Sequence, residues 1–236
     1  SIVDLDSNER PIAVMINTHK EARPQAGLSD AFIVYELMVE GGITRMMALY
    51  TQDADEAKIG SIRSSRHNYL DYVMENDAIY IHWGGSDVAY SHLSELKLDR
   101  IDGMVYGGKY FTTDSSLDRS LEHTRFTSSE LIKKGIEKLN LRTTTDKGYL
   151  LNYTADTVDL SKKDSSKVAN NVTIKYSSYQ TVSYEYNTPN NDSFGHHELW
   201  YAITNNKVTF DADDDSIIQT VLQIDGLGRA VRTAKT

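Results

Sequence analysis

The stretch "FIVYELMVEGGITRMMALYT", residues 32–51, decides the fold of the first half of the chain. Two apolar runs flank Gly41 and Gly42, and adjacent glycines accept the positive φ angles of a two-residue type I′ turn. The stretch therefore predicts a β-hairpin around these glycines.

A two-residue loop also predicts the register of this hairpin. It pairs Glu40 with Ile43, Met38 with Arg45, and Glu36 with Met47. One face then carries the charged side chains of Glu36, Glu40 and Arg45. The other face is apolar or aromatic and holds Ile33, Tyr35, Leu37 and Val39. We expect the apolar face to be buried, and the charged face either to meet solvent or to form a site.

Outward from the hairpin, strands and helices alternate. Apolar runs predict strands at 10–17, 59–65 and 78–85, and helical periodicity predicts helices at 66–76, 86–97 and 128–139. Capping residues precede each helix: Ser64 and Ser65 the first, Ser86 the second, and Thr127 with Glu130 in a capping box the third. This part of the chain is predicted to be mixed α and β.

The composition changes from about residue 143 to Thr, Ser, Asn, Asp and Tyr. Runs of β-branched or aromatic residues at 171–178, 181–188, 199–210 and 216–225 are separated by turn residues, which is typical of antiparallel strands. The sequence therefore predicts an α+β fold with an N-terminal α+β domain at residues 1–145 and a smaller β-rich domain at residues 146–236.

Bulk composition narrows the function classes. The chain has 236 residues and a formal net charge of -9, which repels a phosphate backbone, so we expect no nucleic-acid partner. The absence of cysteine excludes disulfides, thiolate metal ligands and a cysteine nucleophile. The sequence contains no run of 18 apolar residues, so it predicts no membrane-spanning helix.

Two arginines stand out in "IGSIRSSRHNYLDY", residues 59–72. Arg63 and Arg66 would flank the start of the predicted helix, whose free N–H groups and positive dipole end attract an anion. This placement predicts an anion pocket. The alternative is a structural ion pair between one of these arginines and Glu36 or Glu40.

Other candidate chemistry is weaker. Glu36 and Glu40 lie four residues apart, about 13 Å along a strand, whereas glycosidase carboxyls lie roughly 5–9.5 Å apart. His82 precedes two glycines at a predicted strand end, where either a structural or a functional histidine fits. The segments "HHEL" (196–199) and "DADDDS" (211–216) lack the spacing of zinc and calcium motifs. We predict no metal and no cofactor.

Several motifs in order resemble a known family. They are "RPIAVMIN" (10–17), "ARPQAGLSDAFIVYELMVEGGITR" (22–45), "IGSIRSSR" (59–66), "AIYIHWGGS" (78–86) and "EHTRFTS" (122–128). Together they resemble the YerB-like family of proteins described as bacterial lipoproteins, from about residue 10 to 130. The resemblance implies an N-terminal domain of sheet, sheet and helix layers followed by a smaller β-rich domain. It also implies an upstream cysteine with a lipid anchor, and a location outside the cytoplasmic membrane.

The resemblance also implies a set of polar site positions. In this chain they fall on Arg23, Glu36, Glu40, Thr44, Arg45, Arg63, Ser64, Arg66, His82 and His123. The chain departs from the family pattern at Ser61, where proline is expected, and at Thr124, where asparagine is expected. The later segments of the second domain also depart from the family order.

Three hypotheses of function follow. The first is a non-catalytic envelope-facing domain that binds an anionic or cell-wall-derived ligand or an envelope protein. Its site would consist of Arg45, Arg63 and Arg66 with Glu36, Glu40 and His82 around them. The second is a hydrolase of cell-wall or phosphoester bonds, with His82 or a glutamate as general base and the arginines stabilising charge. The third is protein docking through an apolar patch or a free strand edge of the β-rich domain. Whether the protein is an enzyme stays open.

Overall fold

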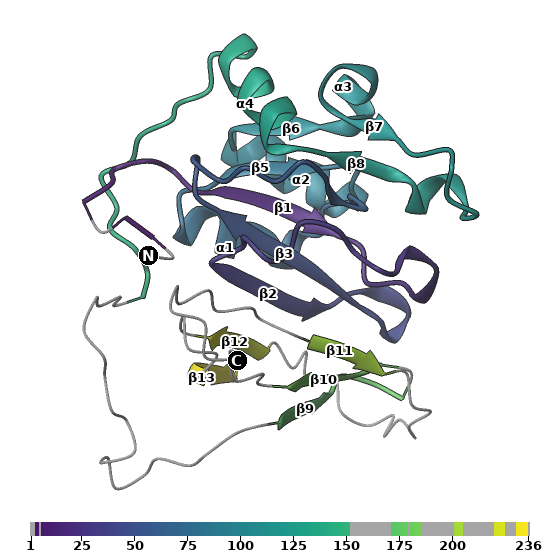
Figure 1. The fold of residues 1–236 in the computed structure, drawn as a ribbon. Helices are drawn as coiled ribbons and strands as arrows, with labels where there is room; N and C mark the ends of the chain where they lie inside the picture. The colour runs from purple at the N-terminus through teal and green to yellow at the C-terminus, as the bar shows by residue number, and fades with distance from the viewer. Residues whose placement is uncertain are drawn as a thin grey trace, which may run out of the picture.

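The computed structural model describes residues 3–4, 6–151, 171–178, 180–185, 201–204, 220–224 and 230–235. It is a mixed α+β protein around one five-stranded sheet (Figure 1). The strands in spatial order are β2 (Ile33–Met38), β3 (Thr44–Tyr50), β1 (Ile12–Ile16), β5 (Ile79–His82) and β6 (Arg100–Asp102). β1 is antiparallel to β3 and parallel to β5, so the sheet is mixed.

Both faces of this sheet are covered, and all of β3 is buried. One face packs against α1 (His67–Glu75) and α2 (Asp87–Leu96), through side chains such as Leu70 and Leu93. The opposite face packs against α3 (Gly103–Tyr110) and α4 (Ser129–Lys138), and against a second sheet in the order β4-β8-β7. These short strands are β4 (Ile59–Gly60), β7 (Thr112–Thr113) and β8 (Arg125–Thr127), and the 3-10 turns are η1 (Lys20–Ala22), η2 (Glu40–Gly42) and η3 (Leu121–His123).

The predicted hairpin at 32–51 is confirmed, but its predicted register is wrong by one residue. Glu36 pairs with Met46 and Leu37 with Arg45, because the loop contains three residues, Glu40–Gly42, rather than two. A slip of one residue turns every side chain of a strand to the other face. Arg45 therefore does not share a face with Glu36. Burial on both faces of β2 removes the alternation that would have indicated the register.

Helix starts also differ from the prediction at two places. Ser86 caps α2 as predicted. Arg66, however, stands at the N-cap of α1 without a side-chain cap, while Ser65 accepts a hydrogen bond from the Tyr80 hydroxyl (3.0 Å). Ser128 caps α4, and Thr127 instead donates to the Tyr110 carbonyl (2.8 Å). A serine near a helix start caps it only when other buried polar groups do not engage its hydroxyl.

Two further differences concern α3 and the predicted strand at 59–65. α3 was not predicted, because "GMVYGGKY" contains three glycines, which disfavour helix. The run at 59–65 forms only the two-residue β4, after which Ile62 makes a single bridge to Ile16.

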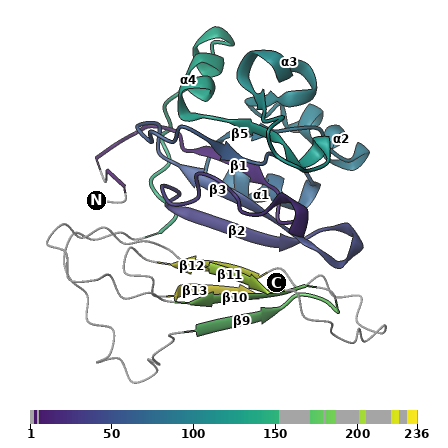
Figure 2. The ribbon, with the colours of Figure 1, turned by 45° about the vertical axis from the view of Figure 1, so that its right-hand side comes forward.

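The strands beyond residue 170 lie beside β2 (Figure 2). β9 (Asn171–Lys175), β10 (Thr181–Glu185) and β11 (Tyr201–Thr204) form one antiparallel sheet, and β12 (Thr220–Ile224) pairs with β13 (Ala230–Lys235). The Tyr176 hydroxyl donates to the Glu36 carbonyl (3.3 Å), which connects the two parts. The sheet, sheet and helix layering, the separate second domain and the boundary at 145 stay predictions. Segments 196–199 and 211–216 lie outside the described residues.

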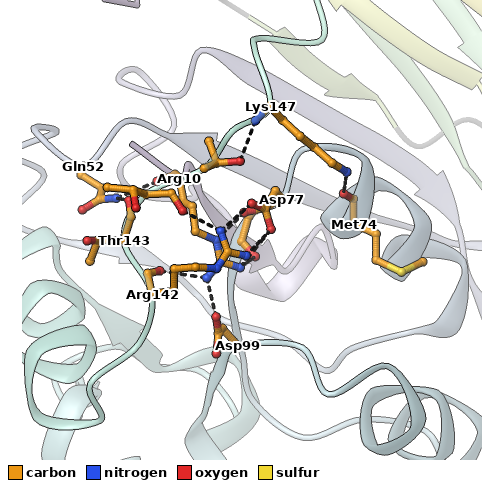
Figure 3. A network of polar contacts seen from close by, with 11 residues as sticks. Arg10, Gln52, Met74, Asp77, Asp99, Arg142, Thr143 and Lys147 are labelled. Carbon is orange, nitrogen blue, oxygen red and sulfur yellow. Dashed lines mark hydrogen bonds and ion pairs between the residues drawn. The ribbon is translucent and has the colours of Figure 1, made fainter. Parts of the chain in front are cut away.

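A buried arginine attaches residues 142–144 to the sheet (Figure 3). Arg10 is 3% exposed and donates to the carbonyls of Asp77 (2.7 Å), Arg142 (2.8 Å) and Ala78 (3.3 Å), while its guanidinium also pairs with Asp99. Hydrogen bonds from Arg142 to the Asp77 carboxylate lower the pKa of Asp77 to about 2. Among the described residues, none of the helices combines the length and apolarity that a membrane crossing needs.

Candidate functional site

A cavity of about 260 Å³ lies where several loops and helix ends meet. The loop after β4 contributes Arg63 and Ser64, the end of β5 contributes Trp83, and β8 contributes Arg125. The remaining lining residues are Ile62, Gly84, Gly85, Tyr90, Met104 and Glu122. Of the predicted site residues, therefore, Arg63 and Ser64 line this cavity.

Trp83 forms one side of the cavity. The Arg125 guanidinium lies 4.1 Å from the centre of the indole ring, and the Phe111 ring packs against the indole in an edge-to-face arrangement with centroids 5.2 Å apart. A Cβ at Gly103 would come within 2.3 Å of the indole, and one at Gly107 within 2.9 Å. Glycines four apart share one helix face, so α3 needs both to admit the indole. The indole is thus packed against α3 and serves as a platform for Arg125.

Arg125 makes no ion pair and no side-chain hydrogen bond among the described residues, and its guanidinium stacks on Trp83. Burial lowers the pKa of Arg125, and the positive charge of Arg63 lowers it further, against the opposing effect of the nearby Glu122. An arginine presents five N–H donors in a rigid fork, so Arg125 offers an unused anion-binding group.

Arg63 is the second cation of the cavity. Its NH2 lies 2.7 Å from Oε2 of Glu122, whose side chain is 49% exposed. Burial raises the pKa of Glu122, but Arg63 more than offsets this, so that pKa falls below its usual value. Two arginines and one glutamate leave the lining with an excess positive charge.

A separate cluster lies at the hairpin end, where the Glu40 carboxylate forms ion pairs with two arginines. Arg66 Nε donates to Glu40 (2.7 Å), and Arg45 NH2 lies 3.4 Å from the same carboxylate. The hydrogen bond from Arg66 lowers the pKa of Glu40 to about 2, while burial and then Arg66 lower the pKa of Arg45 to about 10. Arg45 also donates to the Ser64 carbonyl (2.6 Å). The predicted pair Arg63 and Arg66 therefore faces two different carboxylates.

Glu36 and Thr44 are buried and lie apart from the cavity lining. The Thr44 hydroxyl donates to the Glu36 carboxylate, and Gln180 from the turn between β9 and β10 donates to the same hydroxyl (3.3 Å). These residues join the hairpin to the strands beyond residue 170.

His82 is fully buried and does not line the cavity. Its Nδ1 lies 2.8 Å from the Gly84 carbonyl and 3.8 Å from Asp102. Burial lowers the pKa of His82, against the opposing effect of Asp102. Asp102 in turn accepts from the Gly84 N–H (2.9 Å). His82 thus supports the Gly84 turn, and the geometry does not suit it as a general base for a ligand in the cavity.

His123 lies in η3 and Arg23 at the end of η1, and neither lines the cavity. The rings of His19 and His123 stack with centroids 4.9 Å apart. His123 Nε2 lies 3.7 Å from Glu21 and 3.7 Å from Glu122. Burial lowers the pKa of His123, and His19 and Arg63 add to this against the effect of Glu122. Arg23 donates to the Thr18 carbonyl (3.1 Å).

Sequence reasoning missed five residues that the fold brings together here. They are His19, Glu21, Trp83, Glu122 and Arg125. Trp83, Glu122 and Arg125 lie inside the motifs quoted above, so a search for aromatic and arginine pairs in those motifs could have found them. No local signal marks His19 and Glu21.

The fold and the cavity define the class of this molecule, an α+β domain with a cationic pocket at a junction of loops. The family described as "Protein of unknown function (DUF3048) N-terminal domain" matches residues 2–142, and the chain belongs to it. This confirms the resemblance seen in the sequence.

Two relatives give the extent of the similarity. The chain is 33% identical over 171 residues to "Putative lipoprotein YerB" of Bacillus subtilis (strain 168), covering 71% of this chain and 50% of the relative. It therefore spans half the length of that relative. The crystal structure of YerB from Bacillus subtilis superposes with a TM-score of 0.66 at 26% identity, over 92% of this chain and 69% of that one.

Proposed function

We propose that this domain binds an anionic ligand derived from the cell wall, in the cavity between Arg63 and Arg125. The observation that carries the proposal is the Arg125 guanidinium, which is stacked on Trp83 and makes no ion pair or side-chain hydrogen bond among the described residues. A planar guanidinium held in place matches a carboxylate or phosphate with two parallel hydrogen bonds.

The dimensions of the cavity limit what it holds. Its volume of about 260 Å³ falls below the roughly 300–1,000 Å³ of pockets for drug-sized ligands. It suits one charged group, such as a phosphate or carboxylate, with the rest of the molecule outside. Met104 and Leu121 are 66% and 60% exposed and offer apolar surface nearby. An envelope protein with an acidic side chain is the alternative ligand.

The cellular setting supports a wall-derived ligand. The relative from Bacillus subtilis is named a lipoprotein. We infer that this chain likewise works outside the cytoplasmic membrane, held there by a lipid anchor. The formal net charge of -9 argues against a nucleic-acid ligand.

The hydrolase alternative receives less support from this geometry. His82 is buried, and the carboxylate at the cavity belongs to Glu122. Arg63 lowers the pKa of Glu122, which makes it a weaker base. Binding therefore accounts for more of the arrangement than catalysis does.

Calorimetric titration tests the proposal. The full chain would be titrated with inorganic phosphate, teichoic-acid fragments and muropeptides, beside the variants Arg125→Ala, Arg63→Ala and Arg66→Ala. We expect saturable binding that falls at least tenfold in Arg125→Ala, because losing a charge-assisted pair costs about 1.5–3 kcal/mol. Arg66→Ala is the matched control at the hairpin and should bind like wild type. Equal affinities of wild type and Arg125→Ala, or no binding to any probe, would contradict the proposal.

A further inference from the structure

A second group of side chains, outside the cavity lining, combines the donor atoms that divalent transition metals prefer. His19, Glu21 and His123 each present one ligand atom, and these atoms lie within 4.8 Å of one another. The two imidazole rings stack nearly parallel, with an interplanar angle of 7°. The Nδ1 atom of each ring is engaged in a hydrogen bond, which leaves Nε2 of each ring as the ligand atom. Glu21 is exposed, which leaves the cluster open to solvent on its side.

The two loops that carry these residues are joined by an arginine. Arg119 donates to the carbonyls of Ala22 (3.0 Å) and Arg23 (2.6 Å), and therefore holds the η1 segment against the η3 segment. His19 and Glu21 belong to the first segment and His123 to the second. The cluster is thus preorganised by contacts that do not involve its own ligand atoms.

We propose that His19, Glu21 and His123 bind a divalent transition-metal ion of the Zn²⁺ type. Two imidazoles and a carboxylate are a common nitrogen and oxygen ligand set for zinc. Because zinc–ligand bonds are about 2.0–2.2 Å long, two ligands of one ion lie at most about 4.3 Å apart. The ligand atoms need to contract by less than about 1 Å from their present 4.8 Å, and the stacked rings need to tilt so that both ring planes contain the ion. An exposed Glu21 and a half-buried His19 allow this movement.

Charge also favours a cation at this place. Glu122 Oε1 lies 3.7 Å from His123 Nε2, so a second carboxylate is close to the cluster. Glu21 and Glu122 carry two negative charges, and Arg63, which pairs with Glu122, carries one positive charge, so these side chains leave a net charge of -1 beside the cluster. Glu122 is engaged by Arg63 and therefore stands outside the ligand set.

The hydrogen bonds of Asn17 give the proposal a specific consequence. Asn17 Nδ2 lies 2.8 Å from His123 Nδ1, and its Oδ1 accepts from the His19 N–H (3.0 Å). An amide donor at Nδ1 places the ring proton on Nε2. Metal bound to Nε2 moves that proton to Nδ1, which then requires an acceptor, so the amide must turn and release the His19 N–H.

Metal binding through Nε2 also changes the tautomer of His19. A substitution at position 17 can lower the free-energy cost of the tautomer change at His123. His19 Nδ1 gives up a long hydrogen bond of 3.3 Å from the Glu21 N–H when Nε2 binds metal. An aspartate at position 17 would offer one oxygen to the His19 N–H and the other to the His123 Nδ1–H. Asn17→Asp should therefore tighten metal binding at least tenfold, the effect that a carboxylate behind a ligating histidine has elsewhere.

The experiment titrates the metal-free full chain with ZnCl₂ by calorimetry, and with Co²⁺ by visible absorption. We expect one equivalent to bind to wild type, loss of binding in His123→Gln, and at least tenfold weaker binding in Glu21→Gln. Glu21 is exposed, so that variant tests the site without disturbing the core. His92→Gln changes an exposed histidine outside the cluster and is the control.

Two results would overturn the proposal. One is the absence of saturable Zn²⁺ binding to wild type, whatever Asn17→Asp does. The other is equal loss of binding in His92→Gln and Glu21→Gln, which would mean non-specific uptake by surface side chains. Because the probe is the metal alone, neither result bears on anion binding at Arg125.

Discussion

Arg10 and Arg125 show two uses of the same side chain within one domain. Arg10 is 3% exposed, and its donors meet three backbone carbonyls and the carboxylates of Asp77 and Asp99. Arg125 is half-buried and stacked on Trp83, and among the described residues its guanidinium meets no acceptor. An arginine whose donors are all engaged holds the fold together, whereas one that is held in place with its donors unused is available to a ligand.

Burial explains why each arrangement is stable. A charge taken fully out of water costs several kcal/mol unless partners replace the water, so Arg10 requires its complete set of acceptors. Arg125 keeps part of its surface in solvent, and the indole ring stabilises its cation without using a hydrogen bond. Solvent is therefore the partner that an anion would replace.

The largest expected effect concerns the structural role of Arg10. Arg10→Leu leaves the carbonyls of Asp77, Ala78 and Arg142 without their donor, so the free energy of unfolding should fall by about 3–5 kcal/mol. Urea denaturation followed by circular dichroism measures the change. Arg125→Leu is the matched variant and should shift stability by less than about 1 kcal/mol. Equal losses in the two variants would contradict the distinction.

The next effect tests the platform under Arg125. Trp83→Ala should lower stability by about 2–3 kcal/mol, less than the 3–5 kcal/mol usual for a buried tryptophan, because this indole is partly exposed. Its indole N–H also lacks a partner among the described residues, so no hydrogen bond is lost. Anion affinity should fall as well, although Arg125 remains. Unchanged affinity in a folded Trp83→Ala protein would show that the stack does not position the guanidinium.

A smaller effect concerns acid stability of the Arg10 network. The pKa of Asp77 is about 2 in the folded protein, below its ordinary value of 3.8. A lowered folded-state pKa stabilises the protein above pH 3.8, and this contribution is lost as the pH falls toward 2. Because solvent screens this partly exposed carboxylate, the contribution amounts to at most about 2 kcal/mol. Urea midpoints from pH 6 to pH 2.5 should decline less in Asp77→Asn than in wild type. The exposed variant Asp118→Asn should follow wild type, and identical slopes for all three proteins would refute the assignment.

The smallest expected effect concerns the affinity of the cavity for an anion. Glu122→Gln removes the carboxylate that pairs with Arg63, and an exposed pair of this kind contributes about 0.2–1 kcal/mol. Anion affinity in the calorimetric titration should therefore rise, by up to about fivefold. Glu40→Gln changes the corresponding carboxylate of the hairpin cluster and should leave anion affinity unchanged. Weaker anion binding in Glu122→Gln would mean that Glu122 takes part in recognition.

The hairpin shows which features the local sequence pattern predicts and which it does not. Apolar runs around Gly41 and Gly42 predicted the two strands correctly, since a pair of glycines between β-forming runs leaves few other conformations. The register did not follow, because both faces of β2 are covered and Glu40 enters the loop to meet Arg45 and Arg66. The contact between Glu40 and Arg66 joins residues 26 positions apart, which the local sequence does not reveal.

The amino-acid sequence by itself determined the α+β class, the positions of most helices and strands, and the resemblance to the family, since these depend on periodicity and short motifs. It also directed attention to Arg63, which lines the cavity. Only the tertiary structure decided which arginines are paired. Arg125 lies 62 positions from Arg63 and 42 from Trp83 in the chain, and no local rule brings them together. Ion pairs and stacks depend on distances of a few ångströms, and these distances exist only once the sheets and helices have packed.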